Sequence, residues 1–341
     1  MIYADNAATT RLSDAAKTAM LPYFDEIYGN PSSLHTAGQV AKEALEDARG
    51  RIAALIGAMP SEIIFTSGGS EADNQALLTA AEYGKKRGKM HIVSTAFEHH
   101  AVLHALKKLE KSGFEVTLLD VHKNGIVTAE DVKSAIRPDT AAVSVMYANN
   151  EIGTVMPIEE IGAVCRAAGV LFHTDAVQAA GHIGIDVKKQ NIDMLSISAH
   201  KFHGPKGVGL LYVRRGIPVS VLIEGGAQER SRRAGTENIP GIVGMAAAFE
   251  DACRSMDSHA KYISALRDKL IEGLSQVPHS VLNGDRERRL PGTVNMCFEG
   301  IEGESLLLML DEAGICASSG SAGVETGSSS RSHASIQNSL T

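Results

Sequence analysis

The chain has few cysteines, no excess of basic residues and no long apolar run. Its four cysteines, Cys165, Cys253, Cys297 and Cys316, are scattered along 341 residues without a CxxC pair. This spacing argues against a disulfide framework and against a zinc site, and it is typical of reduced thiols in the cytosol. We therefore expect a cytoplasmic protein.

The charge balance excludes further classes of protein. The 40 acidic residues outnumber the 33 basic ones and give a net charge of −7, so a nucleic-acid binder or a membrane-surface binder is not expected. No apolar stretch is long enough to cross a bilayer, and Met1–Asn6 lacks the start of a secretory signal. With 44% hydrophobic residues, the composition is that of a globular protein long enough for two domains.

Between about residues 60 and 215, short β-branched runs alternate with helical patterns. Helices are predicted over 71–83, 101–110 and 158–168, and a capping-box sequence at Thr128 opens another helix that runs through Ile136. The predicted strands are Glu62–Thr66, His91–Thr95, Val116–Asp120, Ala142–Ala148, Val170–Asp175, Met194–Ser198 and Val208–Val213. Such alternation indicates an α/β fold with a mostly parallel sheet covered on both faces.

The pattern changes after Gly241. Helical stretches over 242–256 and 260–274 precede a strand-like segment at 293–298 and a helix-like segment at 304–311. We interpret this region as a second, smaller α+β domain. The predicted limits are 16–256 for the large domain, and 1–15 together with 257–341 for the small one.

Lys201 follows a predicted buried strand and lies among small residues. Partial desolvation there lowers the pKa of an amine and frees it to form an imine, although a lone lysine is more often a surface residue. Asp175 ends another predicted strand at the same edge of the sheet, where ligands of such sheets bind. A carboxylate there can hold a pyridinium nitrogen protonated, with Gln178 reaching the phenolic oxygen of the ring. Alternatively, Asp175 is an ordinary helix cap.

The segment 66–71, Thr-Ser-Gly-Gly-Ser-Glu, joins a predicted strand to a helix. The small residues Gly69 and Ser70 let backbone N–H groups approach a phosphate at the helix N-terminus. The segment matches neither the dinucleotide-binding nor the P-loop pattern. Together with Lys201 and Asp175 it is a plausible phosphate site, and alone it is a common turn.

Three further segments supply candidate side chains. His99 follows a strand and can shuttle protons over a ring, Asn150 ends another strand, and Thr236 lies in a basic loop before a helix. Each also suits simple turn or capping chemistry. Adjacent histidines rarely converge on one ion, and no partner has suitable spacing, so no metal site is predicted.

Together these motifs resemble one family, the cysteine desulfurases, which are fold-type-I, class V aminotransferase-like enzymes that depend on pyridoxal 5'-phosphate (PLP). The resemblance extends from Ile2 to about Ala322. The matching motifs, in order, are Asp5-Asn6-Ala7-Ala8-Thr9-Thr10, Gly29-Asn30-Pro31-Ser32-Ser33, the loop at 66–71, Glu98-His99, Asn149-Asn150-Glu151-Ile152-Gly153, Asp175-Ala176-Val177-Gln178, Ser198-Ala199-His200-Lys201 and Arg233-Ala234-Gly235-Thr236.

The resemblance implies a seven-stranded large domain and a homodimer with the active site at the subunit interface. It implies conversion of L-cysteine to L-alanine with sulfur transfer to an acceptor protein, for iron–sulfur clusters or thio-cofactors. The implied catalytic residues are Lys201 and His99, with His99 stacked on the ring. The implied cofactor contacts are Asp175, Gln178 and Asn150 for the ring, and Gly69, Ser70, Ser198, His200 and the partner subunit's Thr236 for the phosphate.

Two departures from the family pattern lie near the C-terminus. Gly323 stands where the family has its sulfur-accepting cysteine, and glycine has no nucleophile. Cys316 is a possible substitute, although a small core residue is the more ordinary reading. Residues 334–340 look like the family's strand that carries a carboxylate-binding arginine, with Gln337 in its place. The chain is then expected to lack the family's last helix.

These departures leave three hypotheses open. The chain is a cysteine desulfurase impaired at its sulfur-accepting step, or a cysteine or cystine β-lyase, which needs no protein thiol. Alternatively, it is a PLP-binding subunit without catalysis that pairs with an active homologue or with a sulfur-acceptor scaffold.

Overall fold

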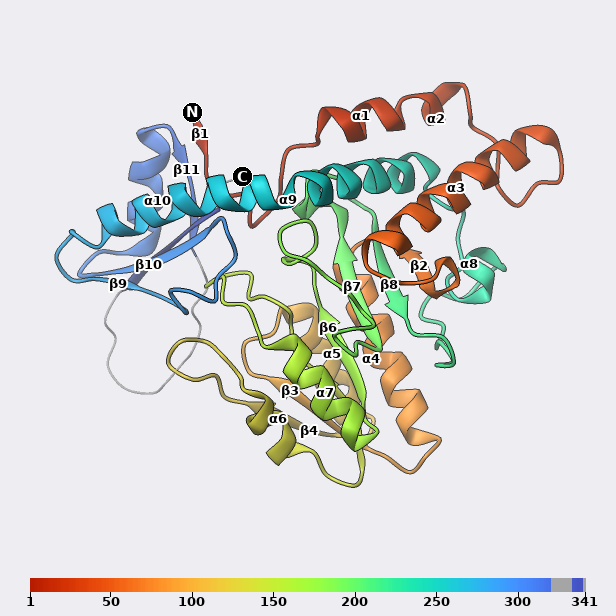
Figure 1. Ribbon diagram of the computed structural model, residues 1–341, viewed down its shortest axis with the longest axis horizontal. Helices are drawn as coiled ribbons and strands as arrows, with labels where there is room; N and C mark the ends of the chain where they lie inside the picture. Colours follow the sequence, from red (N-terminus) through yellow and green to blue (C-terminus); the bar gives the residue numbers. More distant parts are fainter. Residues whose placement is uncertain (320–332, 340–341) are drawn as a thin grey trace.

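The computed structural model describes residues 1–319 and 333–339. It contains a large part built on a seven-stranded sheet and a smaller part with a four-stranded and a two-stranded sheet. The long helix α9 (Ile239–Leu274) runs from one part to the other across the top of the molecule in Figure 1.

The large sheet has the strand order β2-β8-β7-β6-β5-β3-β4. Only β8 runs antiparallel to its neighbours, and the other pairs are parallel. The mostly parallel seven-stranded sheet that the sequence predicts is therefore confirmed. Its strands are β2 (Ile63–Thr66), β3 (His91–Thr95), β4 (Glu115–Leu119), β5 (Thr140–Ser144), β6 (Leu171–Asp175), β7 (Met194–Ser198) and β8 (Gly209–Val213).

Both faces of this sheet are buried, and successive strand residues enter different cores. Ile64 packs with α4 (Gly69–Lys85) on one face, whereas Phe65 belongs to the core on the other face, with α3 (Thr36–Leu55), α7 (Ile158–Ala168) and α9. The helix α5 (His100–Lys111) lies beside α4. Alternation of side chains along each strand explains why the strands read as continuous apolar runs.

Most predicted elements are confirmed, with two corrections. The capping box at Thr128 opens α6 (Ala129–Ala135) as expected. The strand predicted over 142–148 is displaced, because β5 ends at Ser144 and residues 145–148 leave it as irregular backbone. The helical stretches predicted over 242–256 and 260–274 are joined without a break in one helix of 36 residues, α9.

The smaller part brings together both ends of the described chain. Its four-stranded sheet holds β9 (Ser280–Leu282), β10 (Thr293–Glu299), β12 (Ser318–Ser319) and β13 (His333–Ser339), and α10 (Gly303–Glu312) packs beside it. The strand β1 (Ile2–Tyr3) pairs with β11 (Ile315–Cys316). The strand and helix expected at 293–298 and 304–311 are thus present. The exact limits 16–256 and 257–341 stay a prediction.

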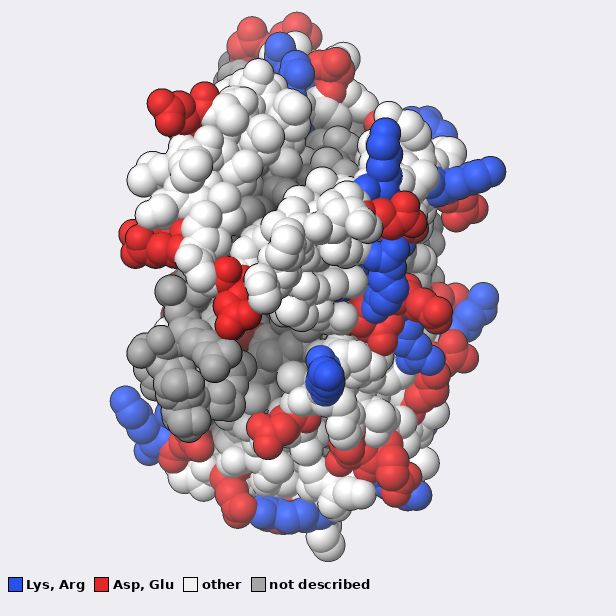
Figure 2. All heavy atoms as spheres, turned by 90° about the vertical axis from the view of Figure 1, so that its left-hand side faces the viewer, with Lys and Arg blue, Asp and Glu red and all other residues white. Residues whose placement is uncertain are grey.

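The remaining elements are short. They are α1 (Asp14–Met20), α2 (Pro22–Asp25), η1 (Pro60–Glu62), η2 (Ala199–Lys201) and α8 (Gln228–Ser231). Seen from the side of the smaller part, acidic and basic side chains of the described residues are spread around an uncharged centre (Figure 2). Across the described ranges, no helix combines the length and the apolar character needed to span a membrane.

Candidate active site

A cavity of about 350 Å³ lies where β2, β3, β6 and β7 end at one edge of the large sheet. We call it the catalytic cavity. Thr236 is exposed and is not among the residues that line it. The other nine candidate site residues all line it: Gly69, Ser70, His99, Asn150, Asp175, Gln178, Ser198, His200 and Lys201.

Lys201 ends the short helix η2, directly after β7. Its Nζ atom donates hydrogen bonds to the carbonyl oxygens of Ala7 at 2.5 Å and of Ala8 at 2.9 Å. Burial lowers the pKa of Lys201, although the nearby carboxylates of Asp175 and Asp5 oppose this effect. The amine therefore loses its proton more readily than an exposed lysine does.

The N-terminal segment holds the lysine loop in place. The Thr10 backbone N–H and hydroxyl both donate to the carbonyl oxygen of His200 at 2.9 Å. The Gln178 side chain donates to the carbonyl oxygen of Ala7 at 3.0 Å. Because the contacts of Ala7 and Ala8 use backbone atoms, only the position of these small residues in a matching motif pointed to them.

Asp175 is buried at the end of β6, and its Oδ1 atom accepts a hydrogen bond from the backbone N–H of Val177 at 2.9 Å. Burial raises the pKa of Asp175 to about 6, against the opposing effects of that bond and of Lys201. A buried carboxylate of this kind is stabilised by a cationic N–H partner, which a protonated pyridine ring provides.

The N-terminus of α4 is open toward the catalytic cavity. Its N-cap residue, Gly68, offers no side-chain acceptor to the first-turn amides. A Cβ atom on Gly69 would lie 2.6 Å from Cγ2 of Val177, so only glycine lets the helix start this close to β6. Ser70, Ser198 and His200 line the same region. Free amides at a helix N-terminus with hydroxyl neighbours suit a phosphate group.

His99 is the N-cap of α5, and its Nδ1 atom accepts a hydrogen bond from the backbone N–H of Ala101 at 3.1 Å. Since Nδ1 accepts, the ring proton lies on Nε2. Burial lowers the pKa of His99, and the positive charge of Lys201 adds to the effect. The imidazole is therefore neutral at pH 7.

Two buried acids near the site were not identified from the sequence. Asp73 lines the catalytic cavity from α4, is 1% exposed, and lies 3.7 Å from Nε2 of His173. Burial, and then the charge of Asp175, raise the pKa of Asp73. Burial likewise raises the pKa of Glu98 to about 8. The available signal for Asp73 was its place one helical turn after Ser70, on the same helix face.

The predicted position of the missing thiol, Gly323, lies outside the described residues. Ser319, at the end of the preceding described segment, lines the catalytic cavity. All four cysteines belong to the described part of the chain, and none of them lines this cavity. Cys316 pairs with Tyr3 between β11 and β1.

The comparisons with known proteins agree with this site. The family model for aminotransferase class V matches residues 2–339. The chain is 52% identical to cysteine desulfurase IscS of Methanosarcina thermophila over 94% of its own length and 79% of that protein's. It is 48% identical to the putative cysteine desulfurase IscS 1 of Bacillus subtilis, over 94% and 85% of the two lengths.

Comparison with solved structures points to the same family. A NifS-like protein superposes with a TM-score of 0.94 at 40% identity and covers 99% of this chain and 93% of its own. SspA in complex with cysteine superposes with a TM-score of 0.85 at 35% identity, over 100% and 99% of the two chains. The chain therefore belongs to the PLP-dependent aminotransferase class V family, within its cysteine desulfurase group.

Proposed function

We propose that this chain binds PLP at Lys201 and acts on L-cysteine as a cysteine desulfurase. The observation that carries the proposal is the convergence of three features on one cavity: a desolvated lysine, a buried carboxylate and an open helix N-terminus. Relatives named cysteine desulfurase and a similar fold solved with cysteine support the choice of substrate.

Each part of the cofactor has a fitting partner in this proposal. The α4 N-terminus with Ser70, Ser198 and His200 takes the phosphate, and Asp175 takes the ring nitrogen. Gln178 and Asn150 lie on the side of the ring oxygen. When bound, PLP supplies an electron sink for the carbon that carries the substrate amine. His99 lines the same cavity as a neutral imidazole, which can take up or return a proton.

The chain lacks the residue that would accept the substrate sulfur. A desulfurase passes the substrate sulfur to a thiolate, and Gly323 supplies none. Because no cysteine lines the catalytic cavity, we propose that cofactor binding is intact and that transfer of sulfur to the protein itself is impaired.

The absence of a cysteine from the catalytic cavity also fits a second candidate function. A cysteine or cystine β-lyase releases sulfide without a protein thiol, and this cavity has the lysine, carboxylate and imidazole that such a reaction needs. A non-catalytic PLP-binding subunit is the third possibility. The three candidates differ in their products, so one assay separates them.

We further propose a homodimer in which Thr236 reaches the partner's cavity. Its support is the exposed position of Thr236 and a run of exposed apolar side chains between α1 and α3, including Phe24, Tyr28 and Leu34. A sulfur-acceptor protein and a cytoplasmic location stay predictions.

The test is incubation of the PLP-loaded protein with L-cysteine, with alanine, pyruvate and protein-bound persulfide all measured. We expect little alanine and no persulfide from the natural chain. Gly323→Cys should produce a persulfide and raise alanine formation roughly tenfold or more, since a missing nucleophile is restored. Gly323→Ser is the matched control, because its hydroxyl cannot form a persulfide.

The other outcomes contradict the proposal in distinct ways. Pyruvate and sulfide as main products would identify a β-lyase. Abundant alanine from the natural chain would show that a thiol other than one at position 323 accepts the sulfur. If Gly323→Cys yields no product at all although PLP is bound, the chain is a binding subunit.

A further inference from the structure

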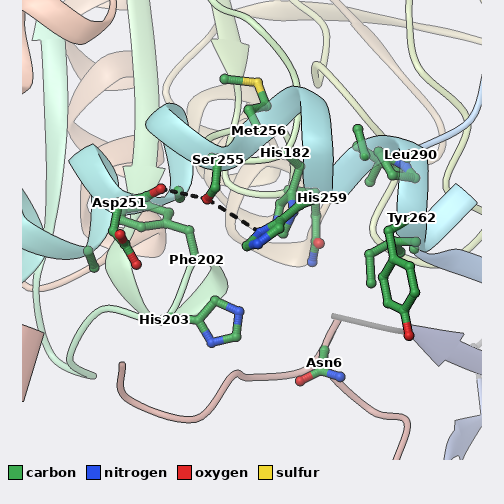
Figure 3. A pocket seen from close by; sticks show the side chains of 18 of the residues that line it. Asn6, His182, Phe202, His203, Asp251, Ser255, Met256, His259, Tyr262 and Leu290 are labelled. Carbon is green, nitrogen blue, oxygen red and sulfur yellow. Dashed lines mark hydrogen bonds between the residues drawn. The ribbon is translucent and has the colours of Figure 1, made fainter. Parts of the chain in front are cut away.

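A second cavity, of about 260 Å³, lies beneath the middle of α9, and we call it the interdomain cavity. Figure 3 shows side chains that converge on it from α9, from the lysine loop and from the N-terminal segment. It shares Gln178 with the catalytic cavity, and residues 6–8 and 201–203 form the wall between the two. None of the residues assigned to cofactor or substrate above, apart from Gln178, lines it.

The wall of this cavity is largely apolar. Phe202 and Ala248 are buried, and Met256, Ile263 and Leu290 extend the apolar surface. Tyr262 is 64% exposed and lies at the mouth, where Figure 3 shows its ring apart from the histidines. A cavity of this size and character suits the flat body of a small organic molecule.

Three imidazoles supply the main polar groups, and their hydrogen bonds fix where each ring proton lies. His182 Nε2 lies 3.0 Å from the carbonyl oxygen of Lys201, and His203 Nδ1 lies 2.9 Å from that of Arg11. A carbonyl oxygen only accepts, so these two nitrogens carry the protons. With one nitrogen donating in this way, the other nitrogen is an acceptor in the neutral form of the ring.

For His259, a hydrogen bond to the hydroxyl of Ser255 shows which ring nitrogen carries the proton. The Ser255 hydroxyl donates to the carbonyl oxygen of Asp251 at 2.7 Å, so its oxygen accepts from His259 Nδ1 at 3.4 Å; both bonds are drawn in Figure 3. In the neutral form of this ring, the Nε2 atom of His259 is then an acceptor as well. Burial lowers the pKa of His182, which keeps that ring neutral.

Among the described residues, the only formal charge on the lining of the interdomain cavity is negative. Asp251 is the only charged side chain among the described residues that line the interdomain cavity, and no Lys or Arg is among them. Its Oδ1 atom also accepts from Arg254 at 2.5 Å, but both side chains are partly exposed, and such surface pairs are weak. The second carboxylate oxygen, Oδ2, has no hydrogen-bond partner among the described residues and can accept further donors.

We propose that the interdomain cavity binds a small organic cation with a flat apolar body and several N–H donors. Acceptor nitrogens of three imidazoles and one carboxylate match the donors, and Tyr262 offers the face of a ring to the positive charge. A bare metal ion fits less well, because within the described ranges no three His, Cys, Asp or Glu side chains come close enough to hold one.

The experiment is calorimetric titration of the PLP-loaded protein at pH 8 with benzamidinium. This cation has a flat ring and four N–H donors, and unlike a primary amine it does not react readily with the cofactor. Benzamide, which is neutral, and benzoate, which is anionic, have nearly the same shape. We expect benzamidinium to bind at least roughly tenfold more tightly than either, as a charge-assisted contact does.

Variants locate the site and test its chemistry. Asp251→Asn should weaken benzamidinium binding roughly 3- to 10-fold, and Tyr262→Ala about 2- to 5-fold. Asp257→Asn is the matched control, because Asp257 is exposed on the same helix and does not line the cavity. Ala260→Trp fills the cavity from its rim and should abolish binding.

Several results would overturn the proposal. Equal binding of benzamide would remove the role of charge, and tighter binding of benzoate would show an anion site on protonated imidazoles. Unchanged affinity in Asp251→Asn, or retained binding in Ala260→Trp, would place the probe elsewhere. Should Ala260→Trp fail to fold, the exposed Tyr262→Ala decides the location in its place.

Discussion

The Nζ atom of Lys201 lies 2.5 Å from the carbonyl oxygen of Ala7, a residue 194 positions earlier in the chain. The contact places a backbone acceptor of the N-terminal segment on the amine that the proposed chemistry needs. The segment therefore belongs to the site, although its residues have no reactive side chains. It also orients the amine before the cofactor arrives.

Lys201 should be the only point of covalent cofactor attachment. Its lowered pKa makes its amine more nucleophilic at neutral pH than that of Lys206, which is exposed five residues later. Borohydride reduction after loading with PLP, followed by peptide mapping, should label Lys201. Lys201→Ala should lose the label and Lys206→Ala should keep it. A label on Lys206 in the natural chain would contradict the assignment.

Asp73 and Asp175 should differ in their effect on cofactor binding. Burial raises the pKa of Asp73 and so favours its neutral form, and the neutral isostere in Asp73→Asn should therefore change the affinity for PLP less than about threefold. Asp175→Asn removes a charge-assisted bond worth about 1.5–3 kcal/mol and should weaken binding roughly 10- to 150-fold. Fluorescence titration of the cofactor-free proteins measures both. Equal losses would mean that Asp73 is ionised.

Glu98 should make the cofactor-free protein less stable as the pH rises. Burial raises the pKa of Glu98 to about 8, so between about pH 4.5 and 8 the folded state binds a proton that the unfolded state releases. The free energy of unfolding then falls with rising pH, by an amount on the order of 5 kcal/mol for this group alone.

Glu98→Gln isolates that effect, because a glutamine oxygen can still accept from Thr95 and Met146, the present donors to Glu98. Urea unfolding from pH 5 to 9 should give a flatter profile for Glu98→Gln than for the natural chain. Glu110→Gln, at an exposed position on α5, is the control. Parallel profiles for all three proteins would show that Glu98 ionises normally.

His99 combines a structural and a chemical role, and two substitutions separate them. His99→Asn keeps an N-cap acceptor for α5, whereas His99→Ala loses it and should cost about 1 kcal/mol of stability. Both remove the imidazole and should lower alanine formation roughly 10²- to 10⁴-fold in the Gly323→Cys background. Urea midpoints and alanine assays report the two roles. Full activity in His99→Asn would exclude proton transfer by His99.

Gln337 should limit substrate capture once a thiol is present. The backbone of β13 places Gln337 opposite Ser318, next to Ser319 at the catalytic cavity. An arginine pairs with a substrate carboxylate through charge-assisted bonds, which glutamine cannot make. Adding Gln337→Arg to Gly323→Cys should lower KM roughly 10- to 150-fold with a smaller change in kcat. Identical steady-state kinetics of the single and double variants would rule this out.

The fold class and most of the candidate site follow from the types and order of residues along the chain. Buried β-branched strands alternating with helices leave few arrangements other than a covered parallel sheet. In such a sheet the strand ends share one edge, so Lys201, Asp175 and His99 had to lie near each other. The absence of a nucleophile at Gly323 is likewise a fact of the sequence alone.

The pairing of the groups in the site, and the shifts of their pKa values, depend on how distant elements pack together. The carbonyl groups of Ala7 and Ala8 contact Lys201 through backbone atoms, which no residue type encodes. The raised pKa values of Asp73 and Glu98 depend on burial, and burial follows from packing between elements far apart in the chain. The joining of the predicted stretches 242–256 and 260–274 into the single helix α9 likewise belongs to the tertiary structure, in which α9 packs against α1 and α3.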